Sequence, residues 1–234
     1  MVFAIAVSVW TPRRHPGPWL RLYARGLALV ILAAWIGEYV ADAVLGTWAV
    51  RYTLPLQLTD AVAAVSILAL WTRRPLLVEL TYFWAFTASL QAVLTPDLGQ
   101  SFPSIFYLTY FTYHIGAIVA ASFLVFGCRM YPRTGAVTRV YLVTLAFTAL
   151  PAVGDLLTGG NYMYLRDKPA HSSLLNLMGA WPWYIVETAA LAFVLLVCVA
   201  GLARVVRAVL DPPASAPAGP TPPPRRRGRP QHSR

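Results

Sequence analysis

The chain has 234 residues, of which 58% are hydrophobic and 12% are charged, whereas soluble domains carry about 45–50% and about 25%. This balance excludes an ordinary soluble protein, and long apolar runs predict helices that cross a membrane. The net charge of +10 would suit a nucleic-acid binder. However, the basic residues gather at the ends of the apolar runs and in a C-terminal tail, as membrane topology places them. We therefore expect an all-α, multi-pass bundle in the cell membrane that contacts lipids and binds no nucleic acid.

Six spans are predicted, and together they form a transmembrane domain over residues 27–210. In chain order they cover residues 27–45, 53–72, 76–94, 104–126, 135–157 and 183–202. The second opens at Thr53-Leu54-Pro55, because proline suits the first turn of a helix. Residues 1–26 form a cytoplasmic or interfacial segment. Its apolar first ten residues are too short to cross, so they either finish a helix that starts upstream or lie at the interface.

Arginines lie mostly on one side of the predicted spans, which favours cytoplasmic N- and C-termini. Only Arg51, Arg166 and Lys168 fall on the other side. At the basic side, Glu79 is expected to pair with Arg73 or Arg74. Residues 211–234 are rich in proline and arginine, a composition that predicts a disordered tail. Its Arg225-Arg226-Arg227 run would contact anionic lipid headgroups.

Acidic residues gather at the opposite, outer ends of the spans. A charge inside the bilayer costs at least about 2.5–3.5 kcal/mol, so such residues normally face a protein interior or a water-filled cavity. Glu38 and Asp42 are four residues apart and therefore share a helix face. We expect a polar cleft that opens outward. The residues predicted to line it are Gln57, Glu38, Asp42, Tyr110, Asp155, Asn161, Trp183 and Glu187.

His114 is the histidine that falls inside a predicted span, and Thr59 lies beside Asp60 near the start of another. His114 is either a structural imidazole bonded to a tyrosine or carboxylate, or a general base, proton relay or metal ligand. Thr59 either bonds within the helix bundle or acts as a nucleophile that needs a neighbouring base. Cys128 and Cys198 lack metal-ligand spacing, so neither a metal site nor another cofactor is expected.

Several short motifs carry a resemblance to a known family. They are Leu54-Pro55-Leu56-Gln57-Leu58-Thr59-Asp60, Glu79-Leu80-Thr81-Tyr82-Phe83-Trp84, Leu90-Gln91-Ala92-Val93-Leu94-Thr95-Pro96-Asp97-Leu98, Tyr113-His114-Ile115-Gly116, Asn161-Tyr162-Met163-Tyr164-Leu165 and Gly179-Ala180-Trp181-Pro182-Trp183-Tyr184. Through them the chain resembles the YwaF-type bacterial integral membrane proteins, which are related to eukaryotic transmembrane protein 164. That family usually has a further N-terminal span. Its first motif usually carries histidine and cysteine where this sequence has Gln57 and Thr59.

The resemblance implies lipid-acyl chemistry. The eukaryotic relatives are described as phospholipid acyltransferases that use a cysteine. The similar androgen-induced-gene proteins are described as lipid-ester hydrolases that use threonine and histidine. A Thr59–His114 pair would match the hydrolases, whereas loss of the thiol is also consistent with an inactive chain.

The favoured hypothesis is an acyl hydrolase or acyltransferase that acts near the outer leaflet. Thr59 would attack the ester, His114 would relay the proton and Asp60 would orient the imidazole. Gln57 and Tyr110 would stabilise the oxyanion. Two alternatives stay open, namely a small-ligand or cation/proton-coupled carrier and a non-catalytic membrane assembly factor.

Overall fold

The computed structural model describes residues 1–169 and 174–212, and this part of the chain is helical with no strand. Its elements are α1 (Val2–Arg14), α2 (Trp19–Val44), α3 (Leu58–Thr72), α4 (Pro75–Trp84), η1 (Ala85–Ser89), α5 (Leu90–Leu94), α6 (Ile105–Ser122), η2 (Phe123–Gly127), α7 (Ala136–Phe147), α8 (Ala149–Thr158), η3 (Tyr162–Tyr164), η4 (Leu174–Leu177) and α9 (Trp183–Leu210). The predicted all-α helix bundle is confirmed.

Five helical stretches of the described chain are long and apolar enough to cross a membrane. They are Trp19–Val44, Pro75–Leu94, Ile105–Gly127, Ala136–Thr158 and Trp183–Leu210. The remaining predicted span corresponds to α3, whose 15 residues extend for only about 22 Å. A hydrocarbon core is about 30 Å thick, so α3 is short for a crossing helix, and the non-helical residues 45–57 precede it.

The outer surface of the bundle is apolar. On α9, the side chains of Val194, Val205 and Val209 are 53%, 63% and 74% exposed. On α2, Leu29 and Val40 are 55% and 53% exposed. Large contiguous apolar surfaces are rare on soluble monomers. Together with the five long apolar helices, this surface identifies a multi-pass membrane protein.

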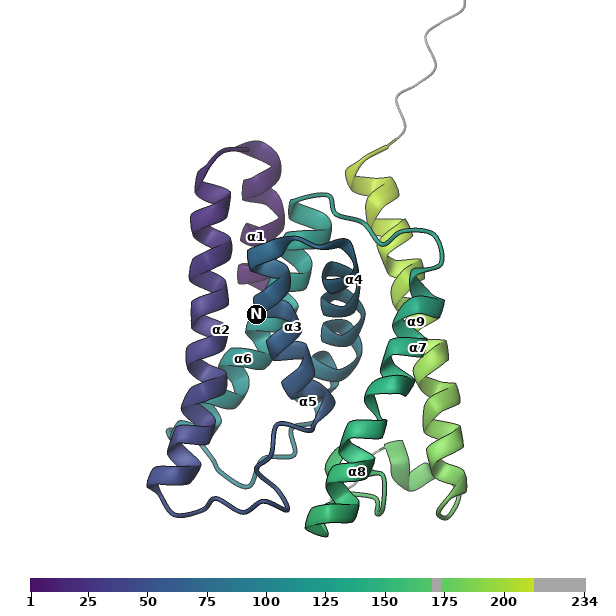
Figure 1. The fold of residues 1–234 in the computed structure, drawn as a ribbon. Helices are drawn as coiled ribbons and strands as arrows, with labels where there is room; N and C mark the ends of the chain where they lie inside the picture. The colour runs from purple at the N-terminus through teal and green to yellow at the C-terminus, as the bar shows by residue number, and fades with distance from the viewer. Residues whose placement is uncertain (170–173, 213–234) are drawn as a thin grey trace, which may run out of the picture.

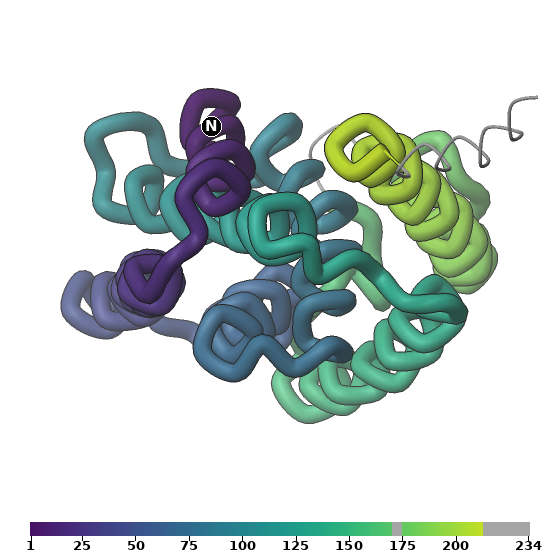
Figure 2. The backbone as a smooth tube through the Cα atoms, turned by 90° about the horizontal axis from the view of Figure 1, so that it is seen from above, coloured from purple at the N-terminus to yellow at the C-terminus, as the bar shows by residue number. Residues whose placement is uncertain are grey.

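The core of the bundle lies around α6. This helix packs against α2 and α3, and α3 in turn packs against α4. Figure 1 shows α7, α8 and α9 beside α4, on the side away from α1 and α2, and Figure 2 shows the same arrangement from above. The indole Nε1 of Trp84 donates to Thr144 Oγ1 at 2.8 Å, and the Tyr82 hydroxyl donates to the carbonyl of Val199 at 3.0 Å. These bonds attach α7 and α9 to α4.

A glycine allows the close approach of α2 and α6. A Cβ atom at Gly116 would lie 2.7 Å from Cγ1 of Ile31, and Ile31 is fully buried. Any larger residue would force the two helices apart. The Gly116 backbone therefore fixes the distance between the helices that carry His114 and Glu38.

Two helices begin at residues other than those predicted. The α2 helix starts at Trp19, eight residues before the predicted position 27, because Arg21 and Arg25 continue the helix beyond the apolar run. The α3 helix starts at Leu58 rather than at Thr53. Leu54 N donates to the Tyr162 hydroxyl at 3.0 Å, so its backbone is held in a loop and Pro55 precedes the helix.

The last two predicted spans also differ from the prediction. A break at Thr148 divides the fifth into α7 and α8. Pro151 explains the break, because its ring lacks an N–H and clashes with the carbonyl four residues earlier, that of Phe147. The sixth span, α9, continues past the predicted position 202 to Leu210 and includes Arg204 and Arg207.

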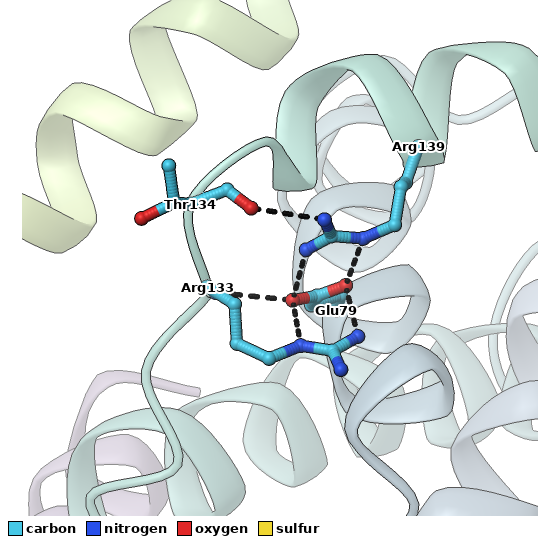
Figure 3. A network of polar contacts seen from close by, with 4 residues as sticks. All are labelled: Glu79, Arg133, Thr134 and Arg139. Atoms are coloured by element: carbon cyan, nitrogen blue, oxygen red, sulfur yellow. Dashed lines mark hydrogen bonds and ion pairs between the residues drawn. The ribbon is translucent and has the colours of Figure 1, made fainter.

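The basic end of the bundle is held by two acidic residues. Glu79, which is 2% exposed, binds the guanidinium groups of Arg133 and Arg139, each with a shortest contact of 2.9 Å (Figure 3). The predicted pairing of Glu79 with Arg73 or Arg74 was therefore wrong. Residues 129–135 fold back over the start of α4, which brings in arginines that are distant in sequence.

Asp211 forms the second contact at this end. It binds Arg13 at 2.5 Å and Arg129 at 3.3 Å, and it accepts a hydrogen bond from the Tyr131 hydroxyl at 2.5 Å. The Tyr131 bond, with the nearby guanidinium groups, lowers the pKa of the Asp211 carboxyl. These contacts tie α1 to the end of α9 at neutral pH, and they weaken as the pH falls. The predicted disordered tail and its lipid-binding arginines lie outside the described residues, apart from positions 211 and 212.

Candidate functional site

Asp60 is the centre of a buried polar cluster between α2 and α3. Its Oδ1 atom accepts hydrogen bonds from Trp35 Nε1 at 2.9 Å and from the Tyr39 hydroxyl at 2.6 Å. Its Oδ2 atom accepts from Gln57 N at 2.9 Å, which completes a capping box at the start of α3. A capping box satisfies backbone donors that a helix end would otherwise leave unpaired. Both Asp60 oxygens are thus engaged, and neither is bonded to His114.

Glu38 lies next to this cluster and is less completely paired. The Tyr113 hydroxyl, from α6, faces the Glu38 carboxyl group, and Tyr113 also lies within electrostatic range of Asp60. The Oε2 atom of Glu38 is buried and has no hydrogen-bond partner among the described residues. Asp42, one turn away, lies in the last turn of α2 and accepts from Thr47 Oγ1 at 2.7 Å. Among the acids around Asp60, Glu38 is therefore the one with spare hydrogen-bonding capacity.

His114 is 1% exposed and packs against two aromatic rings of its own helix. The centroid of its imidazole lies 4.3 Å from those of Tyr110 and Tyr113. Its Nδ1 atom is buried without a partner in the described structure. Buried nitrogen atoms are seldom left unpaired in proteins, so this atom stands out as a candidate functional group. The Tyr110 hydroxyl is not its partner, because it donates to the carbonyl of Ala92 at 3.0 Å.

Thr59 lies in the first turn of α3 and is half-buried. Residues three, four and seven positions later share its helix face, and these are Val62, Ala63 and Ser66, all fully buried. This periodicity places Thr59 at the N-terminal end of the α3 face that packs into the bundle. Although α3 packs against α6, no hydrogen bond joins Thr59 to His114 in the part of the chain that the structure describes.

A loop at the same end of the bundle closes over the start of α3. Met163 N donates to Gln57 Oε1 at 2.9 Å, and the Tyr162 hydroxyl donates to the carbonyl of Val50 at 2.5 Å. A Cβ atom at Gly160 would lie 2.6 Å from the carbonyl oxygen of Arg51, so only glycine fits there. The loops 45–57 and 159–168 are therefore closely docked, and the second one covers the helix end that carries Thr59.

Two predicted site residues, one in α8 and one in the loop itself, hold the backbone of this covering loop. Asp155 is 2% exposed, and its Oδ1 atom accepts from Tyr162 N at 2.6 Å. Asn161 Oδ1 accepts from the backbone N–H groups of Arg166 and Asp167. Burial raises the pKa of the Tyr162 phenol, so its hydroxyl remains a donor. Asp155 and Asn161 thus act on the loop's own backbone.

The predicted residues on α9 lie apart from the cluster. Trp183 is 68% exposed, and Glu187 is exposed and accepts from Gly179 N at 3.0 Å. Tyr184, between them in sequence, is buried and donates to the carbonyl of Tyr164 at 2.6 Å. The contact from α9 to the covering loop is therefore made by Tyr184 rather than by the two residues predicted.

Sequence reasoning missed three members of the cluster, namely Trp35, Tyr39 and Tyr113. Trp35 and Tyr39 are four residues apart and so share one helix face, which was a usable signal. Tyr113 directly precedes His114, and adjacent residues on a helix point about 100° apart. Tyr113 and His114 both belong to the site only because α6 packs against α2 and α3 at the same time.

No group of three or more histidine, cysteine, aspartate or glutamate side chains in the described chain is placed to hold a metal ion. What the cluster offers is a carboxyl oxygen and several hydroxyl groups, with the His114 imidazole packed against the ring of Tyr113. A model of the TMEM164 family matches residues 1–200. The chain belongs to the TMEM164 family.

Membership of the TMEM164 family confirms the resemblance seen in the motifs. The match includes α1 and every helix that carries the cluster. No curated protein and no solved structure matches this TMEM164-family chain.

Proposed function

We propose that this TMEM164-family protein is a membrane enzyme that cleaves or transfers the acyl group of a lipid ester. The observation that carries the proposal is the buried, unpartnered Nδ1 atom of His114. A general base needs a nitrogen that is free to accept a proton. The half-buried Thr59 hydroxyl, on a helix that packs against α6, is the nucleophile.

In the proposed reaction, the Thr59 oxygen forms a bond to the ester carbonyl carbon while its proton passes to His114. Collapse of the tetrahedral intermediate breaks the ester C–O bond, and the leaving alkoxide takes the proton from His114. Water or an acceptor alcohol then attacks the acyl-threonine and gives its proton to His114. The bond between the acyl carbon and the Thr59 oxygen breaks, the acyl group leaves as a fatty acid or a new ester, and Thr59 takes back the proton from His114. The amide Nε2 of Gln57 makes no hydrogen bond within the described residues and is the proposed oxyanion donor.

Asp60 has a positioning role in this proposal. Its bonds to Trp35, Tyr39 and Gln57 N hold the first turn of α3, which carries Thr59. Glu38, with Tyr113 between it and the imidazole, is the carboxylate that offsets the charge of the protonated base. Asp60 therefore positions the helix, whereas Glu38 acts on the charge of the imidazole.

Reconstitution of the wild-type chain in phosphatidylcholine vesicles tests this function. We expect release of fatty acid and lysophospholipid from the diester lipid, and none from a matched diether lipid, which lacks the carbonyl. Mass spectrometry of extracted lipids measures both products, and an added lysophospholipid acceptor reveals transfer. Absence of deacylated product in all conditions, or equal loss of the diether lipid, contradicts the enzyme assignment.

A proton-coupled carrier of a small ligand is the second candidate, and the buried Oε2 atom of Glu38 favours it. That atom would bind a proton or the ligand's donor. We expect Glu38→Gln to abolish proton uptake by vesicles loaded with a pH-sensitive dye. Glu187→Gln is the matched control, because Glu187 is exposed at the same end of the bundle. Equal proton uptake in wild type, Glu38→Gln and protein-free vesicles rejects the carrier.

A further inference from the structure

A basic cavity lies at the other end of the bundle, between the start of α2 and the end of α3. It has a volume of about 160 Å³ and is lined by Arg21, Arg25, Leu70, Trp71, Thr72 and Arg73. A single water needs roughly 10–15 Å³ of such space, so the cavity can hold a group as large as a phosphate. Three of its six lining residues are arginines.

These arginines lack an acidic partner. None of the ion pairs in the described chain involves Arg21, Arg25 or Arg73. The Nη2 atom of Arg73 is buried without any hydrogen-bond partner in the described structure. Arg73 also has a φ of +52°, a left-handed conformation that ends α3 and brings its side chain to the cavity. An unpaired buried guanidinium nitrogen is costly and indicates a missing anion.

The neighbouring arginines are different, because they already have counter-charges. Of the nine acidic residues in the sequence, Glu79 and Asp211 are the two at this end of the bundle. Glu79 is occupied by Arg133 and Arg139, and Asp211 by Arg13 and Arg129. The chain therefore has no acid left for the cavity, and the anion must come from another molecule.

The surroundings of the cavity fit a lipid. Trp71 is 52% exposed and carries the Arg25 guanidinium over its ring at 5.2 Å, and tryptophan is typical of the headgroup level of a membrane. Toward the middle of the bundle, Leu29 on α2 and Leu68 on α3 are 55% and 50% exposed. An acyl chain would lie along these leucines while the phosphate entered the cavity.

We propose that this cavity binds the headgroup phosphate of an anionic phospholipid. Arg21 and Arg25 contact the phosphate from α2, and the guanidinium group of Arg73 donates to it from the end of α3. Basic pockets between membrane helices bind anionic headgroups in this manner. This lipid site is separate from the cluster around Asp60 and His114. It does not depend on the protein being an enzyme.

Native mass spectrometry of the full chain in detergent, titrated with phosphatidylglycerol, tests the proposal. Removing two basic residues at a membrane surface weakens attraction by about 1 kcal/mol each, so we expect Arg21→Gln/Arg25→Gln to bind about 30-fold more weakly. Arg14→Gln/Arg74→Gln is the matched control. It removes the same charge from two exposed arginines at the same end that do not line the cavity. Equal weakening in both double variants indicates diffuse attraction and overturns the site.

Two further arms identify the source of the phosphate and the part of Arg73. Inorganic phosphate and glycerol phosphate should displace phosphatidylglycerol poorly, because they lack acyl chains. Displacement at concentrations equal to that of the lipid would show a soluble phosphate as the ligand instead. Arg73→Gln should weaken lipid binding while wild-type and variant proteins melt at the same temperature in phosphatidylcholine. A lower melting temperature with unchanged lipid binding would assign Arg73 to folding and remove it from the site.

Discussion

Thr59→Ala and His114→Ala are each expected to lower the turnover of an ester phospholipid by about 10²–10⁴-fold, the usual contribution of a positioned general base and of the group it activates. Without the hydroxyl no acyl-enzyme forms, and without the imidazole the hydroxyl keeps its proton. The two losses should not add in the double variant, because both residues act in one step. Initial rates of fatty-acid release in vesicles measure the effect.

A structural role for the same residues predicts a different outcome. His114 is fully buried, so its removal leaves a cavity and lowers stability whatever its function. Added imidazole should restore turnover in His114→Ala but should not restore stability. Thr112→Ala is the control for threonine removal, because Thr112 is exposed on α6 and bonds only to the carbonyl of Leu108. Losses of turnover that match the loss of folded protein, without rescue, count against the catalytic assignment.

Hydropathy was sufficient to predict the fold because long apolar runs have few alternatives in a bilayer. The sequence located the helices 75–94, 105–127 and 183–210 to within a few residues at their N-terminal ends. The second span was misplaced at its start because Leu54 and Pro55 resemble a helix start. In the folded chain Leu54 N is bonded to Tyr162, a residue more than a hundred positions away.

The candidate site was predicted in part, for a related reason. The cost of burying charge correctly indicated that Glu38 and Asp60 face the protein interior. Which hydrogen-bond partner each acid has depends on contacts between helices, and such contacts leave no periodic pattern in the sequence. Asp60 is occupied by α2 and by its own helix end, whereas Glu38 keeps a free oxygen. Trp183 and Glu187 share a face with each other, but α9 turns that face away from the bundle.

The same limit explains the basic end of the bundle. Counting arginines predicted that they lie together, and their proximity to Glu79 in sequence suggested Arg73 and Arg74 as its partners. The structure instead assigns Glu79 to Arg133 and Arg139, and this frees Arg73 for the cavity at the end of α3. The unexpected pairing is therefore what leaves an arginine without a counter-charge.

Glu79→Gln is expected to lower the free energy of unfolding by about 3 kcal/mol. Removing one partner of a buried ion pair costs about 3–5 kcal/mol. We place this case at the lower end because the Arg133 and Arg139 side chains are 52% and 39% exposed and water screens them. The loss should be large for a single substitution because Glu79 serves two guanidinium groups and the backbone N–H of Arg133. For a chain of this size, the melting temperature should fall by roughly 6–12 °C.

Tryptophan fluorescence during thermal unfolding in detergent measures this shift, with Glu187→Gln as the control for an exposed glutamate with one backbone partner. A double-mutant cycle with Arg139→Gln separates ion pairing from simple burial. If Glu79 acts through its arginines, Arg139→Gln should cost much less in the Glu79→Gln background than in the wild type. If both backgrounds lose the same stability, or Glu79→Gln melts like the control, then Glu79 does not hold residues 129–135 against α4. The loop must then be fixed by the contacts of Asp211 with Arg129 and Tyr131.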